Sequence, residues 1–186
     1  MPTGQALHDA RTLLLDAGRR VLSSDGAGAL TSRAVTETSG VAKGVLHRHF
    51  ADFDDYLGAL VGEERRRIEN IEPLVADSAS AAVTDVLEQV FTPTMLGLAS
   101  ILITRERLRR RLQRDGSPEV PLFADTTSVV ADVLAAEREV GWIPEDADIP
   151  ALALTLVGSA HLLYVSAGDA RPTRDALDRI VQSILP

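Results

Sequence analysis

Residues 31–50 read TSRAVTETSGVAKGVLHRHF, the pattern of two short helices joined by a tight turn. Thr31 is a good N-cap for the segment SRAVTET that follows it. Gly40 ends that segment and suits a turn whose backbone needs a positive φ angle. Three apolar side chains are placed to pack beneath both helices at the crossing angle of a helix-turn-helix: Val35, Val41 and Leu46.

The second helix, from about Ala42 to His49, presents this outer face: Lys43, Gly44, Val45, His47, Arg48 and His49. Its length suits insertion into the major groove of DNA, and its N-terminal end attracts phosphate. Two interpretations of His47 and His49 stay open, donation to phosphate or a packing role. They do not predict a zinc site, because side chains two residues apart do not share a helix face and no third ligand is nearby.

Helical periodicity continues through the rest of the chain, and no segment alternates like a strand. A helix ending at Ser23-Ser24-Asp25-Gly26 precedes the quoted stretch. Asp52, with Asp55 in a variant capping box, begins a helix that Pro73 stops. Later helices are expected at residues 82–91 before a kink or break at Pro93, and at residues 95–114, 122–140, 150–167 and 172–185. The predicted fold class is all-α, with about nine helices.

The composition excludes several classes of protein. The 186 residues include no cysteine, so there is no disulfide and no thiolate metal site. No apolar run approaches the roughly eighteen residues of a membrane span, and we expect a cytoplasmic protein with no membrane partner. Four histidines, no HExxH motif and no phosphate loop lead us to expect no enzyme, no catalytic residues, no cofactor and no metal.

The charge is divided unevenly along the chain. Overall it is −8, which looks wrong for a DNA-binding protein. Residues 1–50, however, carry six basic and four acidic side chains, whereas residues 51–186 carry 13 basic and 23 acidic ones. Screening limits the reach of a charge to about 8–10 Å at physiological salt, so an acidic body is compatible with a DNA-binding head.

Residues 10–60 resemble the DNA-binding domain of the TetR family. The likeness lies in LLDAGRRVLSSDG for the first helix, LTSRAVTETSGVAKG for the second helix and turn, and LHRHF followed by ADFDDYL. Further on, REVGWIPEDADIPALA resembles the junction before this family's penultimate helix. The sequence departs from the family in lacking hydroxyl groups at Ala42 and Val45, tyrosines at His47 and His49, and a phosphate-binding lysine at Phe53. Gly18 replaces an alanine, which costs about 1 kcal/mol inside a helix.

The resemblance implies a three-helix helix-turn-helix DNA-binding domain in residues 1–50 and a helical ligand-binding and dimerisation domain in residues 51–186. It implies a transcriptional regulator, a repressor that binds palindromic double-stranded operator DNA as a homodimer and responds to a small-molecule effector. The alternatives are an architectural DNA-binding protein without a ligand and a helical enzyme. The implied DNA contacts are Thr31, Ser32, Arg33, Ala42, Lys43, Val45, His47, Arg48 and His49.

Candidate effector contacts are mostly apolar, which predicts a mostly apolar effector. They are Phe91, Met95, Leu98, Leu102, Phe123, Trp142 and His161. Core packing explains each of them equally well, and His161 is either a hydrogen-bonded core residue or a ligand anchor. The run RERLRRRLQR, residues 105–114, predicts a solvated helix with a structural role against the head, with an i,i+4 pair between Glu106 and Arg110. Binding of a ligand phosphate is the alternative.

The last two helices carry more apolar surface than a domain of this size needs inside. In the TetR family the corresponding helices pair with their symmetry mates, and an isologous twofold contact fits this surface. An internal core is the alternative. The candidate interface residues are Leu152, Leu156, Ser159, Leu163, Leu177, Ile180, Val181 and Ile184.

Overall fold

The computed structural model describes residues 4–74, 76–113, 119–168 and 170–185, with side chains from residue 10 onward apart from that of Lys43. Every regular element in these residues is helical, which confirms the all-α prediction. The elements are α1 (Gly4–Ser24), the 3-10 turn η1 (Ala27–Ala29), α2 (Ser32–Ser39), α3 (Lys43–His49), α4 (Phe53–Glu69), α5 (Ala79–Val90), α6 (Pro93–Thr104), α7 (Glu106–Leu112), α8 (Phe123–Val140), α9 (Ile149–Ser166) and α10 (Arg174–Ile184).

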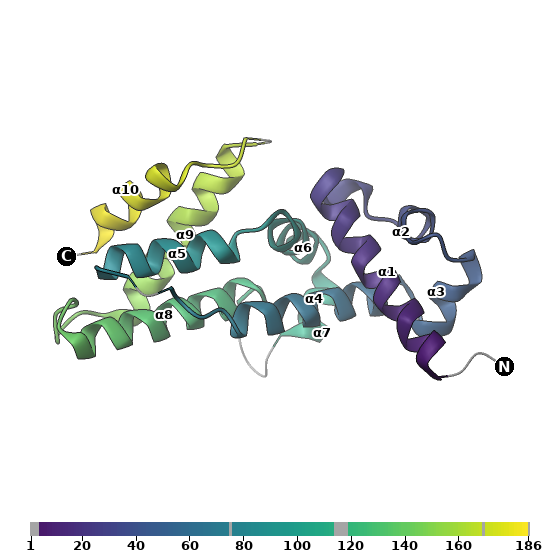
Figure 1. The fold of residues 1–186 in the computed structure, drawn as a ribbon, viewed down its shortest axis with the longest axis horizontal. Helices are drawn as coiled ribbons and strands as arrows, with labels where there is room; N and C mark the ends of the chain where they lie inside the picture. Colours follow the sequence, from purple (N-terminus) through teal and green to yellow (C-terminus); the bar gives the residue numbers. More distant parts are fainter. Residues whose placement is uncertain (1–3, 75, 114–118, 169, 186) are drawn as a thin grey trace. The chain divides into compact units, whose positions relative to one another are not determined.

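The helices pack as two compact units (Figure 1). The first unit comprises Met1–Arg65 and Pro93–Pro121, and the second comprises Arg66–Thr92 and Leu122–Pro186. The two compact units do not divide at residue 50, where the sequence analysis placed the domain boundary. Helices α6 and α7 belong to the same unit as the helix-turn-helix.

The core of the first unit lies between α1 and the helices around it. The buried face of α1 includes Leu14, Ala17 and Leu22, and α2, α3 and α6 all pack against this helix. Gly97 allows the approach of α6, because a Cβ atom there would lie 2.8 Å from Cδ2 of Leu22. The first unit thus holds α1 on two sides, by the helix-turn-helix and by α6.

The second unit is built from α5, α8, α9 and α10, with α8 against α9 and α10 against α5. Apolar side chains fill its centre, and polar contacts fasten the last helix. The carboxylate of Asp178 accepts hydrogen bonds from the hydroxyls of Ser80 (3.0 Å) and Thr84 (3.1 Å) on α5. Arg174 forms an ion pair with Glu88 at 2.6 Å. These contacts fix one face of α10 inside the protomer.

Two helix predictions change at α6 and α7. Pro93 is the first residue of α6, so the predicted kink or break is a break. The single helix predicted over residues 95–114 is wrong, because Arg105 leaves helical geometry with φ −104° and ψ 78°. The hydroxyl of Thr104 donates to the carbonyl of Ser100 at 3.2 Å, and such local bonds compete with helix continuation. Arg114 lies outside the described residues.

The expectation that no apolar run reaches the length of a membrane span is wrong for helix α9. Its 18 residues have a mean hydropathy of 1.6 and no charged side chain, so by length and composition it is able to span a membrane. The core helix of a soluble protein passes the same test, and 33% of this stretch is buried within the protein. The packing of α9 against α8 and α10 accounts for part of its apolar character.

Candidate nucleic-acid interface

The helix-turn-helix begins and ends as its sequence predicts. The hydroxyl of Thr31 accepts a hydrogen bond from the N–H of Ala34 at 3.1 Å, which caps α2. Gly40 ends the helix in the left-handed region, with φ 71° and ψ 8°. A side chain at this position would be strained, so glycine is what lets the chain turn into α3.

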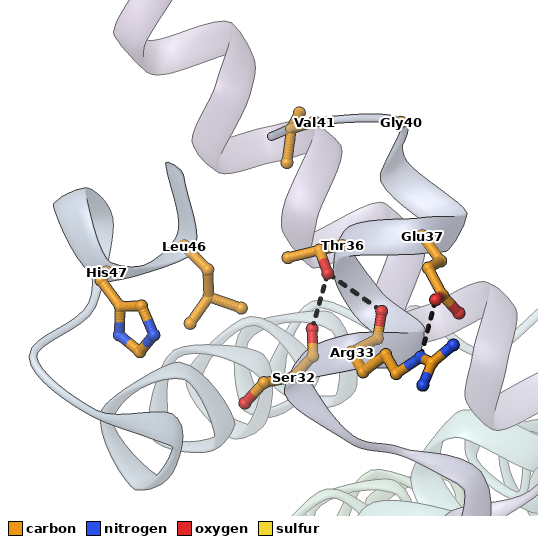
Figure 2. A pocket seen from close by; sticks show the side chains of 8 residues that line it. All are labelled: Ser32, Arg33, Thr36, Glu37, Gly40, Val41, Leu46 and His47. Atoms are coloured by element: carbon orange, nitrogen blue, oxygen red, sulfur yellow. Dashed lines mark hydrogen bonds and ion pairs between the residues drawn. The ribbon is translucent and has the colours of Figure 1, made fainter. Parts of the chain in front are cut away.

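The two helices enclose a hollow of about 530 Å³ on the surface of the first unit (Figure 2). Val35 and Leu46 are buried, as expected for the packing side of α2 and α3. Leu46 and Val41 line the hollow (Figure 2). The hydroxyl of Thr36 donates to the carbonyl of Ser32 at 3.0 Å. The residues lining the hollow are Ser32, Arg33, Thr36, Glu37, Gly40, Val41, Leu46 and His47.

The residues expected to contact DNA differ in accessibility. Thr31, Arg33, Ala42, His47 and Arg48 are exposed, and Ser32, Val45 and His49 are half-buried. Lys43 is the first residue of α3, and its side chain lies outside what the structure describes.

Two of the residues expected to contact DNA, Arg33 and His49, interact with other parts of the protein. Arg33 pairs with Glu37 at 2.7 Å, and this contact is exposed, so it is weak enough for a phosphate to replace. The Nε2 atom of His49 is buried without a hydrogen-bond partner among the described residues, and its ring centroid lies 6.4 Å from that of Phe50. The packing interpretation of His49 is thereby favoured over donation to phosphate, whereas His47 faces the hollow (Figure 2).

Three residues separate the end of α3 from the start of α4, which lies at the predicted capping box. The carboxylate of Asp52 accepts from the N–H of Asp55 at 2.7 Å, and that of Asp55 accepts from the N–H of Ala51 at 3.1 Å. Phe53, where the family often has lysine, stacks on Tyr56 with ring centroids 5.4 Å apart. This position therefore contributes packing in place of a phosphate contact.

Two arginines of the run at residues 105–114 form ion pairs with the first turn of α4, which agrees with the structural role predicted for this run. Arg105 pairs with Asp54 at 2.7 Å and Arg111 pairs with Asp55 at 3.0 Å. The predicted pair between Glu106 and Arg110 is present at 2.5 Å. The sequence indicated the helix and its local pair, but it gave no signal for the contacts with residues more than fifty positions earlier.

The sequence model of the bacterial regulatory proteins of the TetR family matches residues 14–56, which span the capped helix-turn-helix and the start of α4. Residues 14–56 therefore match the DNA-binding region of the TetR family, and this match covers about a quarter of the chain. This confirms the resemblance and the predicted DNA-binding helix-turn-helix class. A comparison with curated protein sequences finds no match.

Several solved structures share the fold along nearly the whole chain. Escherichia coli NemR in its reduced form has a TM-score of 0.73 at 14% identity, covering 96% of this chain and 98% of its own. The TetR-family regulator PfmR from Thermus thermophilus has a TM-score of 0.62 at 14% identity, covering 92% and 96%. The multidrug binding protein EbrR, complexed with imidazole, has a TM-score of 0.60 at 20% identity, covering 95% and 94%.

Among the candidate effector residues, three gather in the second unit. The ring of His161 lies 4.6 Å from that of Phe123, edge to face, and 6.4 Å from that of Phe91. Tyr164, which the sequence analysis missed, stacks on Phe91 at 5.1 Å. Tyr164 lies three residues beyond His161, and residues at this spacing share a face of a helix, so the sequence did contain a signal for it. We call Phe91, Phe123, His161 and Tyr164 the aromatic cluster.

The other candidate effector residues lie elsewhere. Met95, Leu98 and Leu102 are fully buried on α6 in the first unit, which favours core packing for them. Trp142 is 41% exposed and lines a different hollow, of about 290 Å³, with Asp77 and Gln182. Within the cluster, Phe123 and His161 are only half-buried, and burial lowers the pKa of His161 below its ordinary value.

The candidate dimer residues need a correction. Leu156, Leu177 and Val181 are at most 1% exposed within a single protomer, so they belong to its core and offer no surface to a partner. Leu152, Ser159, Leu163, Ile180 and Ile184 are half-buried. The large exposed apolar side chains of α9 are instead Leu154, Leu162 and Val165.

Proposed function

We propose that this chain is a regulator of the TetR family, a repressor that binds palindromic operator DNA as a homodimer and is released by a small, mostly apolar effector. The observation that carries the proposal is the α2–α3 pair. Its turn at Gly40 sets the second helix against a buried core while leaving His47 and Arg48 exposed on that helix. A short, exposed second helix of this kind is the element that enters the major groove in helix-turn-helix proteins.

The apolar face of α9 supports a homodimer. Leu154, Leu162 and Val165 are 63%, 67% and 58% exposed, and they follow one another at helical spacing. Monomers seldom leave such faces uncovered, and a twofold axis covers a face with its own copy. Gly158 lies between them with nothing within 4 Å of its Cβ position, so a second α9 is able to approach closely there. We name this surface the α9 face: Leu154, Gly158, Leu162 and Val165.

The aromatic cluster supports a mostly apolar effector. Phe123 and His161 remain partly accessible beside the buried ring of Phe91, so a flat apolar molecule has rings to stack against and one imidazole to bond. EbrR, which shares the fold, is described as a multidrug binding protein. An effector switches the regulator only if it binds two conformations with different affinities.

The proposal places this regulator in the cytoplasm, where operator DNA is found, and gives it no enzymatic role. The described residues contain no group of three or more histidine or acidic side chains that could hold a metal ion. The α9 face is assigned to the second protomer and not to a membrane.

A selection experiment tests the whole proposal. The full-length protein is used to select duplexes from a random-sequence DNA library, and the proposal expects palindromic sites. Apolar small molecules are then screened for thermal stabilisation of the protein, and each hit is tested for release of the selected duplex. Phe123→Ala should abolish stabilisation by a hit, while Trp142→Ala, outside the cluster, should retain it.

Two outcomes contradict parts of the proposal. Failure to enrich any duplex would count against DNA binding. Hits that stabilise the protein without changing its affinity for the duplex would favour the architectural alternative, in which the helical body carries no switch.

A further inference from the structure

The first turn of α4 is held by two arginines from a segment that is distant in sequence. Arg105 forms an ion pair with Asp54, and its guanidinium carbon lies 6.0 Å from the ring centroid of Phe53. Arg111 forms an ion pair with one oxygen of Asp55, while the other oxygen accepts the hydrogen bond from the N–H of Ala51. Both arginines belong to the same compact unit as the helix-turn-helix.

The carboxylates of Asp54 and Asp55 lie where their negative charge would affect DNA bound to α3. Three residues separate the end of α3 from the start of α4, so Asp54 and Asp55 follow closely on the second helix of the helix-turn-helix. Carboxylates in a first turn are favourable for the helix itself, because they offset its dipole. They are unfavourable beside a DNA backbone, because charges act over about 8–10 Å at physiological salt.

We propose that Arg105 and Arg111 are positioning residues for DNA binding, which neutralise the carboxylates at the start of α4 so that a duplex docked on α3 is not repelled. The inference rests on the proposed DNA-binding function and adds residues that lie outside the helix-turn-helix. It gives the acidic start of α4 a counter-charge supplied by α7 and its N-cap. The arginines act through Asp54 and Asp55 and need not touch DNA.

The chain offers a matched control on the same helix. Arg110 forms its ion pair within α7, with Glu106 at 2.5 Å. Arg110→Gln therefore removes the same charge from the same unit without uncovering a carboxylate of α4. Arg105→Lys is the conservative variant, because it keeps the positive charge beside Asp54.

The test measures affinity for a duplex selected by the wild-type protein, by fluorescence anisotropy at low salt. Arg105→Gln should weaken binding roughly three- to tenfold, a size set by Coulomb interactions in water at this range. Asp54→Asn in the Arg105→Gln background should restore affinity to within about twofold of wild type, and Arg105→Lys and Arg110→Gln should bind like wild type. The deficit of Arg105→Gln should shrink as salt is raised.

A purely mechanical role for the ion pair gives a different pattern. Both the single Arg105→Gln variant and its combination with Asp54→Asn lack the pair, so both would bind equally weakly, and this result overturns the proposal. Equal binding by wild type and Arg105→Gln, with melting temperatures unchanged, overturns it too while leaving the proposed function intact. Failure of the wild-type protein to select any duplex overturns both.

Discussion

The hydroxyl oxygen of Tyr56 occupies the place where a side chain at position 18 would begin. A Cβ atom built on Gly18 would lie 2.0 Å from this oxygen and 2.9 Å from Cδ1 of Leu60. The hydroxyl donates a hydrogen bond to the carbonyl of Leu14 at 2.9 Å, and the Tyr56 side chain is fully buried. The glycine inside α1 is therefore a condition for the close packing of α4 on α1.

Replacing this glycine should destabilise the protein despite the higher helix propensity of alanine. Gly18→Ala gains about 1 kcal/mol of propensity, but it forces a shift of the buried Tyr56 and Leu60 side chains. We expect a net loss of about 1–3 kcal/mol in the free energy of unfolding, typical of overpacked cores. Urea unfolding followed by circular dichroism measures it.

Two further variants isolate the cause. Gly62→Ala on α4 is the matched control, because no atom of another element lies within 4 Å of its Cβ position, and it should stabilise the protein by about 1 kcal/mol. In a Tyr56→Phe background, which lacks the hydroxyl, Gly18→Ala should cost less than in wild type. Additive effects of the two substitutions would show that the hydroxyl is not the obstacle.

The example of Gly18 shows where sequence reasoning stops. Caps and turns were predictable because their signals are local: Thr31 caps α2, Asp52 and Asp55 cap α4, and Gly40 turns the chain. The reason for Gly18 depends on a tyrosine 38 positions away, and no periodicity announces such a contact.

The α9 face was missed for a related reason. Helix α9 is apolar on nearly all sides, so its pattern does not tell which stripe faces the core of its own protomer. Leu156 was assigned to the dimer and is buried, whereas Leu154 and Leu162 were not assigned and are exposed. Likewise, the return of α6 and α7 to the first unit is a long-range feature that composition does not encode.

Acidification should weaken the second unit through His161. Burial lowers the pKa of this imidazole in the folded protein, whereas the unfolded chain titrates near its ordinary value of about 6.5. The stability linked to this shift is present above pH 6.5 and is lost as the pH falls toward the lowered pKa, because the unfolded chain binds the proton first. Thermal unfolding between about pH 7 and pH 5 should show a smaller decline in His161→Gln than in wild type; identical declines would contradict the assignment.

The α9 face should control the oligomeric state. Leu154→Arg together with Leu162→Arg should yield a folded 19.9 kDa monomer, because two charges are buried against their symmetry copies in any dimer built on this face. Light scattering coupled to size exclusion measures the mass. Val140→Arg is the matched control, since Val140 is 69% exposed at the end of α8 and should leave the dimer intact.

Other results would change the assignment of the interface. A wild-type protein that elutes only as a monomer at micromolar concentration would contradict the dimer. A dimer that survives both arginine substitutions would move the interface away from the α9 face.

Helix α3 is the proposed DNA-binding element, and the salt dependence of binding tests this role most directly. Each arginine or lysine that neutralises a phosphate contributes about 0.9 to the slope of log affinity against log salt. Fluorescence anisotropy with a duplex selected by the wild-type protein should show weaker binding and a smaller slope for Lys43→Ala and for Arg48→Ala, with the dimer still folded. Arg138→Ala, in the second unit, should behave like wild type. Unchanged affinity and slope in both α3 variants would contradict the account.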